Sequence, residues 1–322
     1  MRQFLVRRFL LSIVVLFGVS IMVYGLVRAM PSDYATNIAA GNRQITAEMV
    51  ENWRRLYGLD VSVPEGYIRW ISAVLQGDLG ESFIFKAPVA SIIGQKMWVS
   101  FGMAFTAFIL ELLIAIPLGV FSATRQYSKL DIGVTVFAFI GISLPTFFFS
   151  AVVQRIFAIE LRWLPLSGMI TARADYTGFA HFLDIAKHMV LPIMVFVVTG
   201  VGSLMRYTRT NMLEVLNADY IRTARAKGLS EHTVVYKHAF RNTMIPIVTI
   251  VGNALPGLFS GAIITEAIFS IDGIGNTAYN ALKTGDIPFI MAFYMFLAIL
   301  TLIGTMLSDV LYAVVDPRVR LG

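Results

Sequence analysis

Long stretches of this chain contain no charged residues, and these stretches predict its helices. Five runs carry no charge at all: 9–27, 132–154, 189–205, 242–265 and 287–308. A sixth run, 97–124, is interrupted only by Glu111. Each run is 17 to 28 residues long, and a helix needs about 20 apolar residues to cross a ~30 Å hydrocarbon core. We therefore predict six membrane-spanning helices, because strands of a membrane barrel would alternate over roughly 10 residues.

The composition supports this assignment and excludes other classes of protein. Apolar residues make up 57% of the 322 residues and charged residues only 14%, against about 45–50% and about 25% in soluble domains. An ordinary soluble enzyme, a disordered protein and a nucleic-acid-binding domain are therefore disfavoured. The chain has no cysteine, which excludes disulfides, thiolate metal sites and cysteine nucleophiles. We predict an all-α, multi-pass membrane protein.

The distribution of basic residues predicts the orientation. The segment 1–8 and the apolar run after it resemble a signal peptide, but the run exceeds the usual 7–15 residues, so we expect a retained span within 1–30. If the N-terminus lies inside, four segments are cytoplasmic and hold 14 basic against 6 acidic residues: 1–8, 125–131, 206–241 and 309–322. The opposite segments hold 12 basic and 13 acidic residues. This bias predicts that both termini are cytoplasmic. The cytoplasmic side is called inner below, and the opposite side outer.

The outer segment 31–96 shows two amphipathic helix patterns ahead of a five-helix core over 97–322. Thr46 is expected to cap the first helix and Gly58 to end it, while Pro64 suits the first turn of the second and Gly77 its end. The residues expected to share a face are Met49, Trp53, Leu56 and Tyr57 in the first helix, and Tyr67, Ile71, Val74 and Leu75 in the second. We expect a cap packed on the spans; a docking surface for an outside partner is the alternative.

The inner stretch 206–241 contains an ordered pair of helix signals. Asp219 is expected to cap a short helix, Gly228 to end it, and Ser230 to cap the next helix. The short helix carries small and basic residues: Arg222, Ala224, Arg225, Ala226 and Lys227. A DNA-binding hairpin is disfavoured between two spans, and a loop that only fixes topology would not need this order of signals. We expect a surface that docks a cytoplasmic partner.

This stretch resembles the EAA loop of ATP-binding-cassette (ABC) importer permeases, and more narrowly of their dipeptide/oligopeptide branch. The resemblance lies in Asp219–Ser230, followed by Lys237–Asn242 and Pro246. Shorter matches follow in order along almost the whole chain: Phe4–Arg8, Gly77–Ser82, Ile116–Gly119, Ser143–Phe147, Trp163–Pro165, Glu266–Phe269 and Asp309–Tyr312. The resemblance implies the type I ABC importer permease fold with six spans.

It also implies that the chain works within a complex. Its partners would be a second, similar permease, two ATP-binding cassette ATPases and an extracytoplasmic substrate-binding protein that delivers a peptide. The chain itself would bind no cofactor and perform no catalysis, with ATP and Mg²⁺ held by the ATPases. The implied coupling-loop residues are Asp219, Tyr220, Arg222, Thr223, Ala224, Arg225, Ala226, Lys227, Gly228, Leu229, Ser230, His238 and Arg241. Nickel chelates, glutathione or another small solute are the alternative substrates.

Three residues are candidates for the translocation path: Glu111, Ser143 and Glu266. Glu111 lies in the middle of a span, where a charge costs about 2.5–3.5 kcal/mol. It therefore either contacts the amino group of a peptide or makes a structural hydrogen bond, and the sequence favours neither. Glu266 and Asp309 lie at span ends, where exposure at the membrane interface would explain them. His188, His232 and His238 lack the spacing of a metal site.

Two other functions are weaker. An autonomous channel or secondary transporter predicts internal repeats and paired charges at mid-membrane, whereas this chain has one mid-span charge and no clear repeat. An intramembrane enzyme needs a nucleophile with a base, or a metal constellation, within its spans, and the spans contain neither. We expect a permease subunit.

Overall fold

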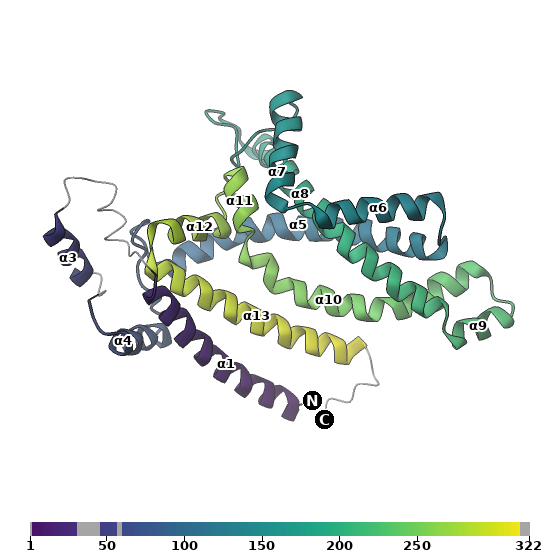
Figure 1. The fold of residues 1–322 in the computed structure, drawn as a ribbon, viewed down its shortest axis with the longest axis horizontal. Coiled ribbons are helices and arrows are strands. Elements are labelled where there is room, and N and C mark those ends of the chain that lie inside the picture. The colour runs from purple at the N-terminus through teal and green to yellow at the C-terminus, as the bar shows by residue number, and fades with distance from the viewer. Residues whose placement is uncertain (1, 31–45, 57–59, 316–322) are drawn as a thin grey trace.

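The computed structural model describes residues 2–30, 46–56 and 60–315. Within these ranges the chain is helical and forms no strand, apart from an isolated bridge between Glu81 and Pro88. In chain order the elements are α1 (Arg2–Arg28), α3 (Ala47–Leu56), α4 (Val63–Leu75), α5 (Val89–Thr124), α6 (Lys129–Ser143), α7 (Thr146–Val153), the π-helix η1 (Gln154–Glu160), α8 (Gly178–Leu216), α9 (Asp219–Ala226), the π-helix η2 (Thr233–Ala239), α10 (Phe240–Ser260), α11 (Ile263–Phe269), α12 (Ile274–Thr284) and α13 (Ile287–Val315). Figure 1 shows α9 at one end of the molecule and α3 and α4 at the other.

The apolar runs become membrane-spanning elements of two kinds. Four helices are long and apolar enough to cross a membrane alone, namely α1, α5, α8 and α13. Two further pairs pass the same test only as bent units, which gives up to six spans in the described part of the chain. The prediction of an all-α fold with six spans is confirmed when each bent pair is counted as one span.

The third run, 132–154, differs from the straight span that its length suggested. It is divided between α6 and the continuous α7–η1 helix, which lie at 106° to each other. The break falls at Pro145, which has no N–H to continue a helix and forces the residue before it into extended backbone. Leu144 accordingly has ψ of 125°, and Pro145 becomes the N-cap of α7.

Close contact between helices α5, α6 and α8 depends on glycine. A Cβ added at Gly119 of α5 would lie 2.8 Å from the carbonyl oxygen of Met205, and one at Gly202 of α8 would lie 2.5 Å from that of Ala138 in α6. Small residues of this kind let helix backbones approach in a membrane, where lipid provides no hydrophobic drive for association. The three helices therefore form a tightly packed unit.

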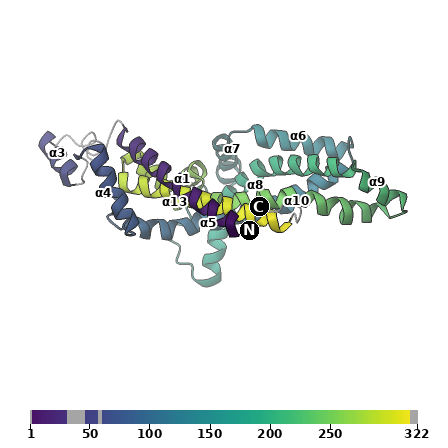
Figure 2. The same ribbon diagram turned by 90° about the horizontal axis from the view of Figure 1, so that it is seen from below.

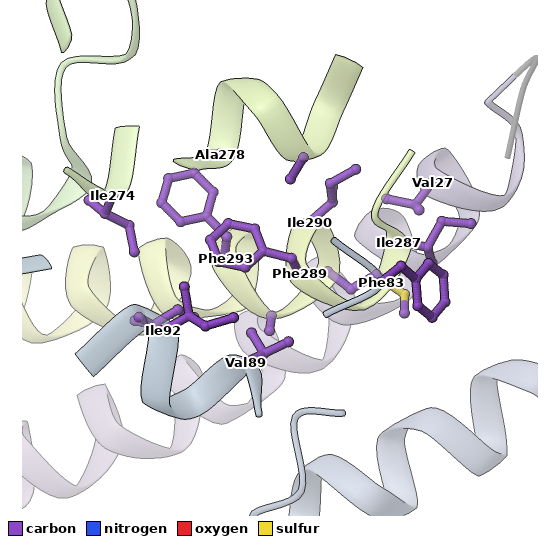
Figure 3. Close-up of a cluster of buried hydrophobic side chains, with 14 of the residues drawn as sticks. Val27, Phe83, Val89, Ile92, Ile274, Ala278, Ile287, Phe289, Ile290 and Phe293 are labelled. Atoms are coloured by element: carbon purple, nitrogen blue, oxygen red, sulfur yellow. The ribbon is translucent and has the colours of Figure 1, made fainter. Parts of the chain in front are cut away.

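The first and last spans lie side by side, as both views show (Figures 1 and 2). Arg8 of α1 and Asp309 of α13 form an ion pair of 2.9 Å between Nη2 and Oδ2. This pair places the beginning of α1 and the last part of α13 on the same side, as the predicted orientation requires. At the opposite end of these helices, buried side chains from α1, α5, α12 and α13 meet in one apolar cluster (Figure 3).

The outer segment forms the two expected helices, although one face differs. Thr46 caps α3 through a bond from the Met49 N–H to its Oγ1 (3.3 Å), and α4 begins with Pro64 in its first turn. Gly58 lies outside the described residues. Leu75 does not share the inward face, because it is 82% exposed, whereas Trp70 stacks on Tyr24 of α1 and Tyr67 meets the same ring edge-on. At α4, this segment is a cap packed on a span.

Candidate functional site

The predicted coupling loop forms a short helix held across the inner ends of other helices. It begins one residue earlier than expected, because Ala218 is the N-cap and Asp219 the first helical residue. The prediction that Asp219 caps the helix is therefore wrong. Its carboxylate instead lies in the first turn, where the helix dipole favours negative charge.

The end of α9 follows the prediction. Gly228 has φ of +78°, a conformation that L-residues with a Cβ rarely adopt, and it follows the last turn directly. A Cβ at this position would meet nothing within 4 Å, so the backbone conformation is what requires glycine. Ser230 then accepts a bond from the Thr233 N–H (3.4 Å) and caps the next helix as expected.

One face of α9 fixes it to the spans. Ile221 is fully buried and Ala224 is 8% exposed, and both belong to an apolar cluster with Val120 of α5 and Met212 of α8. The small side chain of Ala224 therefore serves packing within this chain. Ala224 thus lies on the face that packs on the spans, whereas Ala226 is exposed on the open side.

The other face of α9 and the residues after it are open and basic. Its exposed members are Asp219, Tyr220, Arg222, Thr223, Arg225, Ala226, Lys227, Gly228, Leu229 and Ser230. Arg225 binds Glu231 through two bonds, Nε to Oε2 (3.1 Å) and Nη2 to Oε1 (2.7 Å). These bonds lower the pKa of Glu231 and raise that of Arg225, and they fix the turn between α9 and η2. His238 is half-buried in η2 and Arg241 is exposed at the start of α10.

Behind this surface, a buried ion pair joins three helices. Asp131 at the start of α6 is 3% exposed. Its carboxylate accepts two bonds from Arg209 of α8, at 3.0 Å from Nε and 3.1 Å from Nη2. It also accepts from the Ser122 hydroxyl of α5 and from the Tyr127 N–H at 2.8 Å. This network fixes the inner ends of α5, α6 and α8 relative to one another.

The three candidates for the translocation path lie in different environments. Glu266 is fully buried, and its carboxylate accepts bonds from Ser100 Oγ (2.7 Å), the Ala262 N–H (3.0 Å) and the Asn276 N–H (3.0 Å). Interfacial exposure does not explain this residue, so that interpretation is wrong. Ser143 is exposed at the end of α6, beside the bend before α7.

Glu111 lies at a cavity of about 490 Å³ between α5, α8 and α10. The polar residues that line the cavity with it are Ser203, Arg206, Tyr207 and Thr210, and the apolar ones are Phe108, Leu112, Leu204 and Ile250. The structure therefore brings Glu111 to a cavity whose lining includes neither Ser143 nor Glu266.

Comparison with known proteins identifies the family. A family model described as the inner membrane component of binding-protein-dependent transport systems matches residues 115–321, and the model of the corresponding N-terminal region matches residues 1–104. The chain belongs to this family. It is a multi-pass membrane component of a binding-protein-dependent transport system.

Curated relatives agree with this assignment, and a solved structure shares the fold. The chain is 37% identical over 99% of its length to the oligopeptide transport system permease protein AppB of Bacillus subtilis (strain 168), whose whole length it covers. It is 33% identical, over 99% of each chain, to a protein of Brucella suis biovar 1 (strain 1330) named as a peptide permease. A chain of the MetNI methionine ABC transporter in an inward-facing crystal form shares the fold, with a TM-score of 0.55 and 18% identity over 70% of this chain and 97% of that chain.

Sequence reasoning missed Arg209 and Arg206, which both lie in a stretch assigned wholly to the inner loop. The helix α8 extends to Leu216, so these arginines belong to a helix of the core and not to a loop. The helical period of 3.6 residues in the hydrophobic pattern continues past residue 205, and this signal could have placed both arginines in a helix. No cluster of three or more His, Cys, Asp or Glu suited to a metal occurs among the described residues; His188 instead pairs its Nδ1 with the Asp184 carbonyl oxygen at 2.8 Å.

Proposed function

We propose that this chain is one of two permease subunits in an ATP-driven importer of di- and oligopeptides. A substrate-binding protein outside the cell membrane would deliver the peptide, and two ATPase subunits would bind on the cytoplasmic side. The permease would bind no cofactor, since ATP and Mg²⁺ belong to the ATPases. The peptide class is supported by the names of the two relatives, one an oligopeptide permease and the other a peptide permease.

The observation that carries the proposal is the two-sided character of α9. One face is fixed to α5 and α8 by Ile221 and Ala224, and the opposite face is exposed and basic. A helix attached in this way transmits movement of a bound partner to the spans, whereas a loop that only set topology would need no buried face. Two conformations of the spans, whose equilibrium ATP shifts by differential binding, would complete the cycle.

Substitution of Gly228 tests this role. Valine is strongly disfavoured at φ of +78°, so we expect Gly228→Val to distort the turn after α9 and to abolish peptide-stimulated ATP hydrolysis. The variant should still insert into the membrane, because a Cβ at this position would meet no atom within 4 Å. Reconstituted transporter, with the binding protein and a labelled peptide, provides the measurement.

Gly228→Asn is the matched control, because asparagine tolerates the left-handed conformation better than other non-glycine residues. It should retain most of the coupling. Equal transport by wild type, Gly228→Val and Gly228→Asn would contradict the assignment of the coupling loop. Failure of the ATPases to co-purify with the wild-type chain would contradict the importer itself.

A further inference from the structure

Glu111 is a carboxylate without a partner inside a membrane-spanning helix. It makes no hydrogen bond or ion pair with any described residue, and it is only partly exposed. The carboxylate lies directly over Gly200 of α8, where an added Cβ would lie 2.5 Å from Oε2 and 2.6 Å from Cδ. Glycine at this position leaves room for the charged group. A carboxylate in an apolar span calls for a cationic or hydrogen-bonding partner, and the described chain does not supply one.

Arg206 is the complementary charge at the same cavity. It lines the cavity with Glu111, yet the two groups do not form an ion pair, and the Arg206 guanidinium has no hydrogen-bond or ion-pair partner among the described residues. Arg206 lies six residues after Gly200 on α8, which corresponds to about 9 Å along the helix axis. The cavity therefore holds two opposite charges that are separated and unpaired.

The rest of the cavity suits a short peptide. Its volume of about 490 Å³ lies within the roughly 300–1,000 Å³ of small-molecule sites, which combine apolar walls with a few polar groups. Phe108, Leu112 and Ile250 supply apolar surface, while the side chains of Ser203 and Thr210 can form hydrogen bonds. Apolar walls accept varied side chains, so selectivity would depend on the charged ends.

An aromatic stripe leads along α5 from its outer part to this cavity. Trp98, Phe101, Phe105 and Phe108 recur at intervals of three or four residues and so share one face of the helix. Phe259 of α10 stacks on Phe101 with the ring centroids 4.3 Å apart. Trp98 is 57% exposed and Phe105 41%, so the stripe offers apolar surface between the outer end and Glu111.

We propose that this cavity is an intramembrane binding site for the charged ends of a peptide, with Glu111 binding the N-terminal ammonium and Arg206 the C-terminal carboxylate. The inference rests on the proposed function, because it gives the transported peptide a site in this chain. A peptide in this orientation satisfies both unpaired charges at once. The aromatic stripe would guide its side chains without selecting among them.

Blocked peptides test the two contacts separately. The assay measures uptake of labelled trialanine, N-acetyl-trialanine and trialanine amide into proteoliposomes that contain the complete transporter and its binding protein. We expect Glu111→Gln to lower uptake of trialanine and its amide at least tenfold and to leave that of N-acetyl-trialanine unchanged. Arg206→Gln should lower uptake of trialanine and its N-acetyl form and spare the amide. Because wild type and variants receive peptide from the same binding protein, a changed ratio arises in the permease.

The binding protein can deliver a blocked peptide so slowly that delivery limits uptake. A second assay therefore omits it and measures equilibrium binding of the three peptides to the transporter in nanodiscs. Glu160→Gln is the matched control and should behave as wild type, because Glu160 is exposed and does not line the cavity. Unchanged ratios in both assays, or equal slowing of all three peptides, would overturn the proposal. Equal slowing by Arg206→Gln alone would fit a lipid phosphate as its partner and would overturn that contact. If wild type imports none of the peptides and imports another solute, the proposed function itself fails.

Discussion

The ion pair between Asp131 and Arg209 should stabilise the permease far more than an exposed pair does. Asp131 is 3% exposed, and the side chain of Arg209 is 23% exposed. Removing one partner of a buried pair costs about 3–5 kcal/mol, because the other charge stays buried without compensation. Partial exposure of Arg209 favours the lower limit. We therefore expect Asp131→Asn and Arg209→Gln each to lower the free energy of unfolding by about 3 kcal/mol.

The two losses should not add, since both substitutions remove the same two bonds. In a double-mutant cycle, residues in one ion-pair network show interaction energies of about 0.5–3 kcal/mol, and two short bonds with a buried acceptor favour the upper part of that range. Reversible unfolding of the purified protein in mixed detergent and SDS measures each free energy.

The exposed pair of Arg155 and Glu160 provides the control. Its side chains are 77% and 55% exposed, so the corresponding cycle should give at most about 1 kcal/mol. Single variants of Asp131 and Arg209 that destabilise no more than the control variants would refute the reasoning. So would additive losses in the double variant, which would mean that the two side chains act independently.

Three further predictions concern other contacts. Glu266→Gln should lower stability by about 1–3 kcal/mol, because three donors now bond the two carboxylate oxygens and the amide would offer them only one acceptor oxygen. Thermal unfolding measures the change. Gly304→Ala should cost about 1–3 kcal/mol by overpacking, since its Cβ would overlap Cγ of Pro256, and the same measurement applies. Glu231→Gln should remove a contribution below about 1 kcal/mol that is full at neutral pH. Since Arg225 lowers the pKa of Glu231 below its ordinary 4.5, this contribution is lost as the pH falls through that lowered pKa, and unfolding measured against pH records it.

Each of these predictions has a contradicting outcome. Gly18→Ala is the control for Gly304→Ala, because a Cβ at Gly18 would meet nothing within 4 Å; equal effects of the two would show that helix packing is not the cause. Wild-type stability of Glu266→Gln would mean that water replaces the lost acceptor. A stability difference for Glu231→Gln that grew on acidification would reverse the sign argued above.

Local signals along the chain predict the helices and several of their ends. The lengths of the uncharged runs predict the number of spans, since a charge in the hydrocarbon core is costly whatever the tertiary structure. Gly228 and Ser230 were correctly predicted because their bonds and backbone angles involve residues within three positions. Asp219 was misplaced by one position, because aspartate favours both the N-cap and the first turn of a helix.

Contacts between distant segments were not predictable in this way. Glu266 looked like a residue at the membrane interface because its partner Ser100 lies 166 positions away. Arg209 looked like a loop cation because Asp131 lies 78 positions before it. The length of the third run suggested a straight span; Pro145 accounts for a break there, but it does not by itself set the 106° between α6 and the α7–η1 helix. For Glu266 and Arg209 the deciding partner is remote in sequence.

The same two helices, α5 and α8, connect α9 to the cavity. Val120 of α5 packs with α9 in one apolar cluster and lies nine residues after Glu111, about 14 Å along the helix. Met212 of α8 belongs to that cluster and lies six residues after Arg206. Coupling between sites depends on packed side chains and rigid elements that move as units, and the Asp131 network fixes α5 to α8 at this end of the two helices. A displacement of α9 would therefore move Glu111 and Arg206 with it, so that the coupling movement that we propose for α9 would also change the site that we assign to the peptide.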